Sequence, residues 1–178
     1  MEQDSFRSFL KPVQTDNEIR AVAEKASEIW HEHFTPILGE AQVNYMLDRF
    51  QSAQAISDAI TREHYRYFFI LSEDEEKVGY CAVQPRGDVL YLSKLYIAKP
   101  YRGRKLASAV IKTLCKTAAA ENYRALRLNC NRNNAETLKI YNRLGFHIIE
   151  EEKTAIGNGF FTDDYVLEKP LTTAKVLN

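Results

Sequence analysis

The spacing of the apolar residues changes near Tyr65, and this change limits the fold more than any other feature of the sequence. Before it, apolar side chains recur at helical spacing, which predicts three helices over residues 15–34, 40–52 and 53–64. Thr15 followed by Glu18 is typical of a capping box at the start of the first helix. Pro36 and Gly39 are expected to end that helix.

After Tyr65 the chain alternates between strand-like and helix-like segments. We expect strands over residues 65–71, 78–83, 89–97, 125–130, 146–156 and 160–167, with a further strand near 6–13. Helices are expected from Leu106 to about Ala118 and from Asn134 to Leu144. The order predicts an α/β (α+β) fold, a mixed, mostly antiparallel sheet of six to seven strands with helices on both faces. The length suits one domain over residues 1–178.

Composition and charge exclude several classes of protein. Lys plus Arg and Asp plus Glu each number 24, and this zero net charge argues against a nucleic-acid-binding protein. No apolar run reaches the roughly 20 residues of a membrane span. The three cysteines are isolated, and the four histidines lack metal-ligand spacing. We therefore expect a cytoplasmic protein without a metal, a nucleic-acid partner or a membrane partner.

The segment KPYRGRKLAS, residues 99–108, lies where a predicted strand is followed by a helix. The first N–H groups of a helix have no intrahelical partner, and the helix dipole adds positive potential, so such a turn suits phosphate oxygens. Arg102, Arg104 and Lys105 add charge there. Taken alone, a basic segment of this kind is more often a solvated loop.

The segment NRNNAETLKIYNRLGF, residues 131–146, places Asn134 at a helix start and Tyr141 two turns further along the same face. Asn134 either caps this helix or binds an amide-bearing ligand. Tyr141 either packs in the core or presents its hydroxyl to a leaving group. Both interpretations are open for each residue on its own.

In order and spacing, the two segments resemble the GNAT superfamily of acetyl-CoA-dependent N-acetyltransferases. The pyrophosphate loop of that family has the pattern Gln/Arg-x-x-Gly-x-Gly/Ala, and this sequence matches it at Arg102 and Ala107, with Lys105 at the middle glycine. The later helix of the family has an asparagine, a tyrosine and a Gly-Phe pair, matched here by Asn134, Tyr141 and residues 145–146. The resemblance covers about residues 65–168, and the helices over about 15–64 would form the acceptor side.

The resemblance implies a role for each matched residue. Main-chain groups of Leu95, Tyr96 and Ile97 would pair with the pantetheine arm of acetyl-CoA, and Asn134 would also bond it. Tyr141 would protonate the departing thiolate. The pyrophosphate would be held by the main-chain amides of Arg102, Gly103, Arg104, Lys105, Leu106, Ala107 and Ser108. We expect lysine to be acceptable at position 105 because the site needs its N–H and because this residue would lie in the first turn of a right-handed helix.

The implied function is direct transfer of the acetyl group to a primary amine of a polyamine-like small molecule or a peptide. The alternative is a non-catalytic acyl-CoA-binding or sensing module, since the strand over residues 89–97 lacks the carboxylate that many relatives use as a base. A homodimer is also kept open. The base itself is left open between ordered water and five side chains, His31, Glu32, His33, Asp163 and Asp164.

Overall fold

The structure, a computed structural model, describes residues 9–172. Its helical elements are α1 (Asp16–Leu38), α2 (Glu40–Phe50), α3 (Ala53–Arg62), η1 (Lys99–Tyr101), α4 (Leu106–Ala120) and α5 (Ala135–Arg143). Its strands are β1 (Leu10–Pro12), β2 (Arg66–Leu71), β3 (Lys77–Arg86), β4 (Val89–Ile97), β5 (Ala125–Asn131), β6 (His147–Gly157) and β7 (Phe160–Pro170). Every predicted element is present, and the part of the expected first strand that precedes residue 9 lies outside the described residues.

The seven strands form one sheet in the order β1-β2-β3-β4-β5-β7-β6. The β1–β2, β2–β3, β5–β7 and β6–β7 ladders are antiparallel, whereas β4 and β5 are parallel. Parallel neighbours need a crossover, and α4 provides it between β4 and β5. The expected mixed, mostly antiparallel sheet is therefore confirmed.

The chain divides into two compact units, which are described separately. Unit 1 comprises Met1–Val83 and Lys94–Val110, and unit 2 comprises Gln84–Ser93 and Ile111–Asn178. Unit 1 holds the first three helices and the loop before α4, and unit 2 holds α5 with β5, β6 and β7. The expectation of a single domain over residues 1–178 stays a prediction.

The first helix of unit 1 begins as its sequence predicts but ends later. The Thr15 side chain accepts a hydrogen bond from the Glu18 N–H at 3.2 Å, and Glu18 accepts one from the Thr15 N–H at 3.1 Å, so the capping box is formed. The prediction that Pro36 ends this helix is wrong, because α1 continues to Leu38. Proline removes only one hydrogen-bond donor, and the Gly39 N–H, which donates to Thr35 O at 2.9 Å, still closes the last turn.

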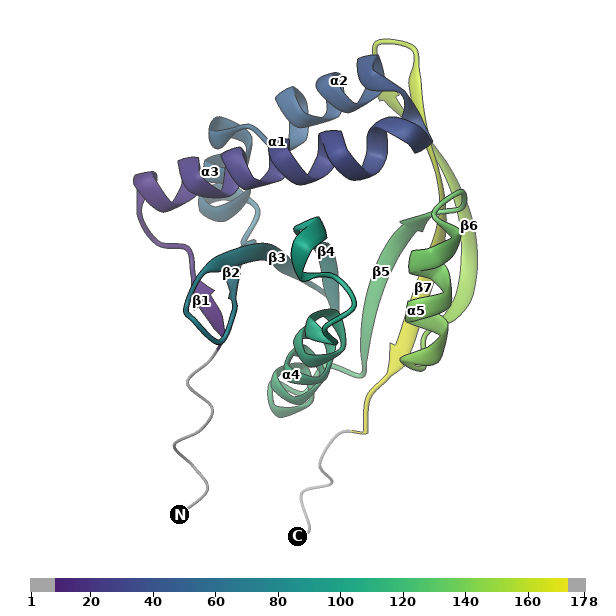
Figure 1. Cartoon of the computed structure of the whole chain (residues 1–178). Coiled ribbons are helices and arrows are strands. Elements are labelled where there is room, and N and C mark those ends of the chain that lie inside the picture. The colour runs from purple at the N-terminus through teal and green to yellow at the C-terminus, as the bar shows by residue number, and fades with distance from the viewer. Residues whose placement is uncertain (1–8, 173–178) are drawn as a thin grey trace, which may run out of the picture. The chain divides into compact units, whose positions relative to one another are not determined.

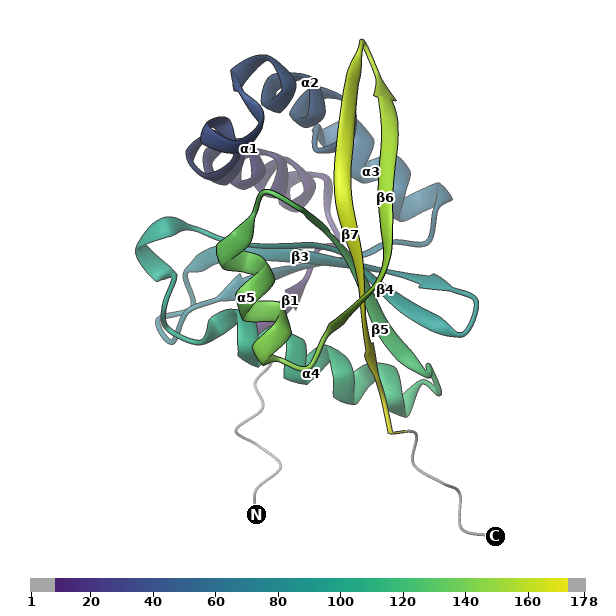
Figure 2. The same ribbon diagram turned by 90° about the vertical axis from the view of Figure 1, so that its right-hand side faces the viewer.

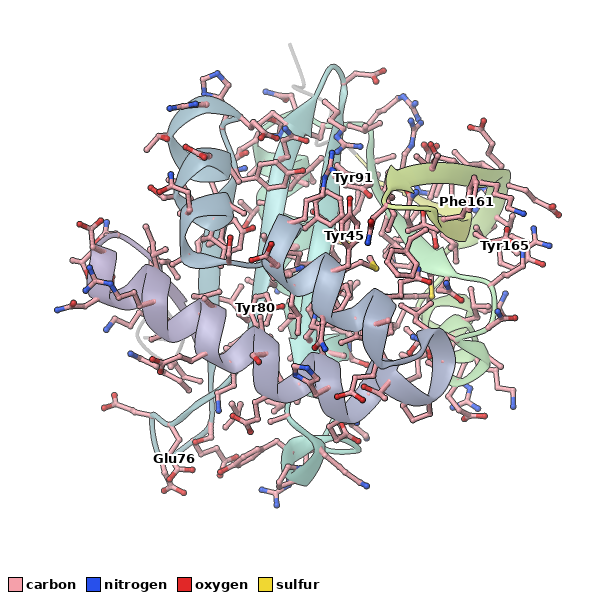
Figure 3. All side chains as sticks on the ribbon, turned by 90° about the horizontal axis from the view of Figure 1, so that it is seen from above. Tyr45, Glu76, Tyr80, Tyr91, Phe161 and Tyr165 are labelled. Carbon is pink, nitrogen blue, oxygen red and sulfur yellow. The ribbon has the colours of Figure 1, made fainter. Side chains whose placement is uncertain are left out.

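The helices α1, α2 and α3 pack against one another and against one face of β2 and β3 (Figure 1). Tyr80 lies beneath α1 in the view of Figure 3, and its hydroxyl donates to Gln51 at 3.2 Å. On the opposite face, Ile70 and Cys81 are also buried, as strand alternation requires when both faces of a sheet are covered. Gly79 has no side chain because an added Cβ would lie 2.3 Å from Tyr96 O.

In unit 2, β6 and β7 form a long hairpin that turns at Gly157, Asn158 and Gly159, all with positive φ (Figure 2). Along β5, successive side chains point to opposite faces of the β5–β7 ladder. One face carries Leu128 and Cys130, which are buried, and the other carries polar residues, among them Arg127. Arg124 and Arg127 both pair with Glu168, whose charge is thereby compensated although only 8% of the residue is exposed.

Candidate functional site

The loop before α4 has an alternating backbone conformation. Gly103 has φ 76° and Lys105 has φ 60°, and Arg104 between them has a negative φ. Alternation of left-handed and ordinary conformations turns successive N–H groups toward one concave side, an arrangement that binds anions. Lys105 therefore does not lie in the first turn of a right-handed helix. That expectation is wrong, because α4 begins one residue later and Lys105 occupies a left-handed conformation that favours glycine.

The main-chain amides of this loop are not all available to a ligand. The Arg102 N–H donates to Lys99 O at 3.2 Å, so it already has a partner. The Ala109 N–H donates to the carbonyl of Lys105, the residue before α4, at 3.0 Å. The N–H groups of residues 106–108 consequently have no partner inside the helix, as at any helix N-terminus. Together with the loop amides of residues 103–105, they fit the diphosphate of a nucleotide-bearing ligand.

The Arg102 side chain joins the loop to two other elements of unit 1. Its Nε donates to Ile97 O at 2.9 Å, and its Nη2 donates to Glu32 Oε2 at 2.7 Å. Lys99 Nζ lies 3.9 Å from the other carboxylate oxygen of Glu32. The guanidinium therefore holds the end of β4 and a side chain of α1, a role that the sequence does not reveal.

The end of β4 presents its main-chain groups in alternating directions. The Ala98 N–H donates to Val78 O at 2.9 Å, and Tyr96 O lies against Gly79, so these two residues face β3. Leu95 and Ile97 face the opposite way, because neighbouring residues of a strand point their N–H and C=O groups in opposite directions. The β4–β5 ladder itself covers only Val89–Tyr91 and Ala125–Arg127 in unit 2.

In unit 2, Asn134 and Tyr141 lie at the two ends of one face of α5. Asn134 is the N-cap residue, 7% exposed, and its side chain makes no capping hydrogen bond. The interpretation of Asn134 as a side-chain cap is therefore wrong. Its N–H donates to Asn131 O at 2.9 Å, which fixes the start of α5 at the end of β5.

Tyr141 is 8% exposed, and its ring packs edge-on against Phe146 with the centroids 5.5 Å apart. Burial raises the pKa of its phenol well above the ordinary value, and the nearby Cys130 raises it further. Within residues 9–172 its hydroxyl has no hydrogen-bond partner. Tyr141 thus keeps its proton at neutral pH and can donate it. Burial also raises the pKa of Cys130 to about 12, so this thiol is a poor nucleophile.

The structure separates the five side chains proposed as bases. In unit 1, His31 is bonded through both ring nitrogens, to Asn44 Oδ1 at 2.6 Å and to Ser27 O at 2.8 Å, and the bond to Asn44 contributes most to raising its pKa. The hydrogen bond from Arg102 lowers the pKa of Glu32. His33 packs edge-on against the Phe34 ring at 4.7 Å. None of these environments favours proton transfer, because the two histidines are held by neighbours and the Glu32 carboxylate is stabilised as an anion.

The two aspartates of β7 in unit 2 differ from each other. Asp163 lies 2.8 Å from Arg132 Nε and forms an ion pair with it. Asp164 has its pKa raised to about 6, first by burial and then by the charge of Glu152. Glu152 and Asn129, which the sequence does not single out, become its neighbours through the strand register. Only the period-two alternation of these strands carries a signal for them.

A pocket of about 360 Å³ lies within unit 2. It is lined by Leu138, Lys139, Asn142, Arg143, Phe146, Ile148 and Leu167. None of the predicted site residues lines it. Residues 9–172 contain no group of three or more His, Cys, Asp or Glu side chains arranged to hold a metal ion. No helix in the same part of the chain is long and apolar enough to cross a bilayer.

Solved structures with the same fold include several N-acetyltransferases. A PaiA N-acetyltransferase from Thermoplasma acidophilum in complex with coenzyme A has a TM-score of 0.74 at 17% identity, over 90% of this chain and 98% of that chain. A spermidine N-acetyltransferase SpeG chimera from Vibrio cholerae and hSSAT has a TM-score of 0.66 at 14% identity, over 90% and 93%. The ribosomal-protein-S18-alanine N-acetyltransferase from Escherichia coli has a TM-score of 0.58 at 16% identity, over 71% and 81%.

At these identities the solved structures show the fold alone. No curated protein matches the sequence. The family itself is shown by the sequence model of the acetyltransferase (GNAT) family, which matches residues 24–146, from the middle of α1 to the Gly-Phe pair after α5. The family model and the matching fold agree with the resemblance of the two motifs, and the chain belongs to the GNAT acetyltransferase family.

Proposed function

We propose that this protein transfers the acetyl group of acetyl-CoA directly to a primary amine of a polyamine-like small molecule or a peptide. The observation that carries the proposal is the environment of Tyr141. This buried phenol is protonated at neutral pH and has no hydrogen-bond partner within residues 9–172, so it has a proton to give to a leaving group. The printed names of two structural neighbours, a spermidine and a ribosomal-protein-alanine N-acetyltransferase, support an amine acceptor without distinguishing its class.

The backbone geometry supports a set of residues that would hold acetyl-CoA. The amides of residues 103–108 would bind the pyrophosphate, since two left-handed residues and a helix N-terminus direct them to one side. In β4, Leu95 and Ile97 have the main-chain orientation suited to the pantetheine arm. Asn134, buried at the start of α5, would bond the same arm, as the resemblance of its motif implies.

Two residues would act directly in the transfer, Ile97 and Tyr141. The N–H of Ile97 would donate to the oxygen of the acetyl carbonyl as negative charge develops there. The Tyr141 hydroxyl would donate its proton to the departing sulfur. We propose no acyl-enzyme, because Cys130 is buried and its pKa of about 12 leaves almost no thiolate at neutral pH.

The test is release of free thiol from acetyl-CoA with polyamines, amino acids, aminoglycosides and short peptides as acceptors, with binding of CoA measured by calorimetry. Tyr141→Phe is expected to lower kcat about 100-fold and to change the Kd of CoA less than about twofold. Tyr123→Phe, a tyrosine of the same unit outside the site, is the matched control. Equal rates in wild type and Tyr141→Phe would remove Tyr141 from the mechanism. CoA binding without turnover on any acceptor would instead favour an acyl-CoA-sensing module.

We also propose a cytoplasmic location and keep the homodimer as a prediction. The support for the location is that Cys81, Cys115 and Cys130 are free thiols, as is usual in a reducing compartment. Fractionation of cells that express the tagged protein checks the location. Sedimentation equilibrium of the purified protein checks the assembly, and a single species of 20.5 kDa would exclude the dimer.

A further inference from the structure

Asp164 lies on β7 at the point where three strands of unit 2 meet side by side. The ladders place it opposite Asn131 of β5 and opposite Glu152 of β6. Residues directly opposite in an antiparallel pair share one face of the sheet, so these three side chains emerge on the same face. Asn129 belongs to that face too, and its Nδ2 donates to Glu152 Oε2 at 2.7 Å. Figure 3 shows Phe161 and Tyr165 on the same hairpin, on either side of Asp164 in sequence.

Within residues 9–172, three side chains and burial set the pKa of Asp164. Burial raises its pKa most, the charge of Glu152 on β6 raises it next, and Asp163 on its own strand raises it slightly. The Asn129 amide lowers it, and the resulting pKa is about 6. Cys130 on β5 is a neutral thiol near pH 6, and the charge of Asp164 helps to raise its pKa. Among the described residues 9–172, Asp164 forms no ion pair, unlike Asp163, which Arg132 holds at 2.8 Å.

Asp164 and Tyr141 share one neighbour at the end of β5, the side chain of Cys130. Cys130 interacts electrostatically with both side chains. Asn131, opposite Asp164, accepts a hydrogen bond from the Asn134 N–H at the start of α5. Asp164 and Cys130 occupy opposite faces of the β5–β7 ladder, and Tyr141 is on the side of Cys130. The phenol and the carboxylate thus approach the same strand end from its two faces.

We propose that Asp164 is the general base that takes a proton from the acceptor amine. This inference rests on the proposed function. The carboxylate accepts one proton from the ammonium form of the acceptor and later releases it to solvent. The nitrogen lone pair then forms the C–N bond as the C–S bond breaks, and Tyr141 donates its proton to the sulfur. The second proton that the nitrogen loses restores the Tyr141 phenol.

The chemistry explains why a carboxylate in this environment suits the task. A base acts best when its pKa lies near the working pH, and an ordinary aspartate, with a pKa near about 3.9, is far too weak. Asp164 is still ionised in most molecules at pH 7, yet it binds a proton far more readily than a solvated aspartate does. The base acts on the attacking nitrogen and the acid on the departing sulfur, so the mechanism needs two separate groups.

The test compares wild type, Asp164→Asn and Asp163→Asn across pH 5–9 with an acceptor found in the thiol-release assay. Asp164→Asn is expected to lower kcat/KM about 100-fold or more and to abolish the loss of rate below pH 6. The Kd of CoA should change less than about twofold. Asp163→Asn, a matched change one residue away, should keep most of the activity and the acidic limb of the profile.

Two further measurements separate a base from a residue that only supports the fold. Glu152→Gln removes a charge that raises the pKa of Asp164, so the acidic limb of the wild-type profile should move to lower pH. Carboxyl-carbon NMR of the protein without ligand should show an aspartate titrating near pH 6 that is absent in Asp164→Asn. An unchanged limb in Asp164→Asn would overturn the proposal while leaving the acetyltransferase function intact. A wild type that releases no thiol with any acceptor would overturn both.

Discussion

Lys105 offers a direct test of the backbone geometry of the phosphate loop. Its φ of 60° lies in the left-handed region, where an L-residue with a Cβ costs about 1–2 kcal/mol relative to the ordinary helical region. Lys105→Gly removes that cost. The glycine also increases the entropy of the unfolded chain, which offsets about 0.5–1 kcal/mol of the gain. We therefore expect Lys105→Gly to stabilise the folded protein by about 0.5–1 kcal/mol, or roughly 1–4 °C in Tm for a chain of this length.

The assay is urea unfolding, with Lys105→Ala as the control. Alanine removes the same charge and the same aliphatic stem as glycine does, but it keeps the Cβ that the left-handed conformation disfavours. The free energy of unfolding of the glycine variant minus that of the alanine variant therefore isolates the backbone effect. If the glycine variant were equal to or less stable than the alanine variant, with equal m-values, Lys105 would not occupy the left-handed conformation.

Two other variants test the charges around the two candidate sites. Glu32→Gln removes a carboxylate 2.7 Å from Arg102, so the guanidinium next to the anion site loses its counter-charge. CoA binding should tighten about two- to threefold at low salt and less at high salt. Weaker binding by calorimetry would show that the pair orders the loop instead. Asp164→Asn should be more stable than wild type by about 1–2 kcal/mol at pH 8 and nearly equal to it at pH 4. The pKa of Asp164 is raised from 3.8 to about 6 in the folded protein, so its ionised form disfavours folding above pH 6. Well below pH 6 the side chain is neutral in the folded protein, and this cost disappears. Urea unfolding at both pH values checks this, and an equal difference at both would show that ionisation of Asp164 does not cause it.

The elements of the fold could be predicted from the sequence because each has a strong local signal. β4 and the start of α3 are found where alternation and helical spacing place them, and the capping box at Thr15 forms as predicted. Local propensity places the end of α1 too early because it counts Pro36 as a helix end, whereas the loss of one donor is small beside the packing of Ile29, Trp30 and Phe34 in the core. Tertiary packing outweighed the local signal there.

Residues of the candidate site could be predicted from the sequence only where they belong to a recognisable sequence motif. Asn134 and Tyr141 are fixed by the spacing of α5, and the phosphate loop by its basic segment. The partners of Asp164 depend on the register of β5, β6 and β7, and register between strands distant in sequence leaves no local signal. The ion pair between Arg102 and Glu32 joins residues 70 positions apart, and a contact between residues so distant in sequence also leaves no local signal. The sequence does not reveal the conformation of Lys105, because lysine is compatible with either a helix or a loop at that position.

Lys105 and Asp164 have one physical property in common, although they lie in different units. Each is a residue whose folded-state conformation or charge costs free energy that a simple substitution would recover, by glycine at one position and asparagine at the other. Selection for stability alone would favour both substitutions. Backbone strain and a raised carboxylate pKa are typical of residues held for binding or catalysis, and here one lies in the anion-binding loop and the other opposite the last residue of β5. If Lys105→Gly and Asp164→Asn both stabilise the protein while only the second abolishes turnover, the strain at Lys105 belongs to the local shape of the loop, and the raised pKa at Asp164 belongs to the chemistry.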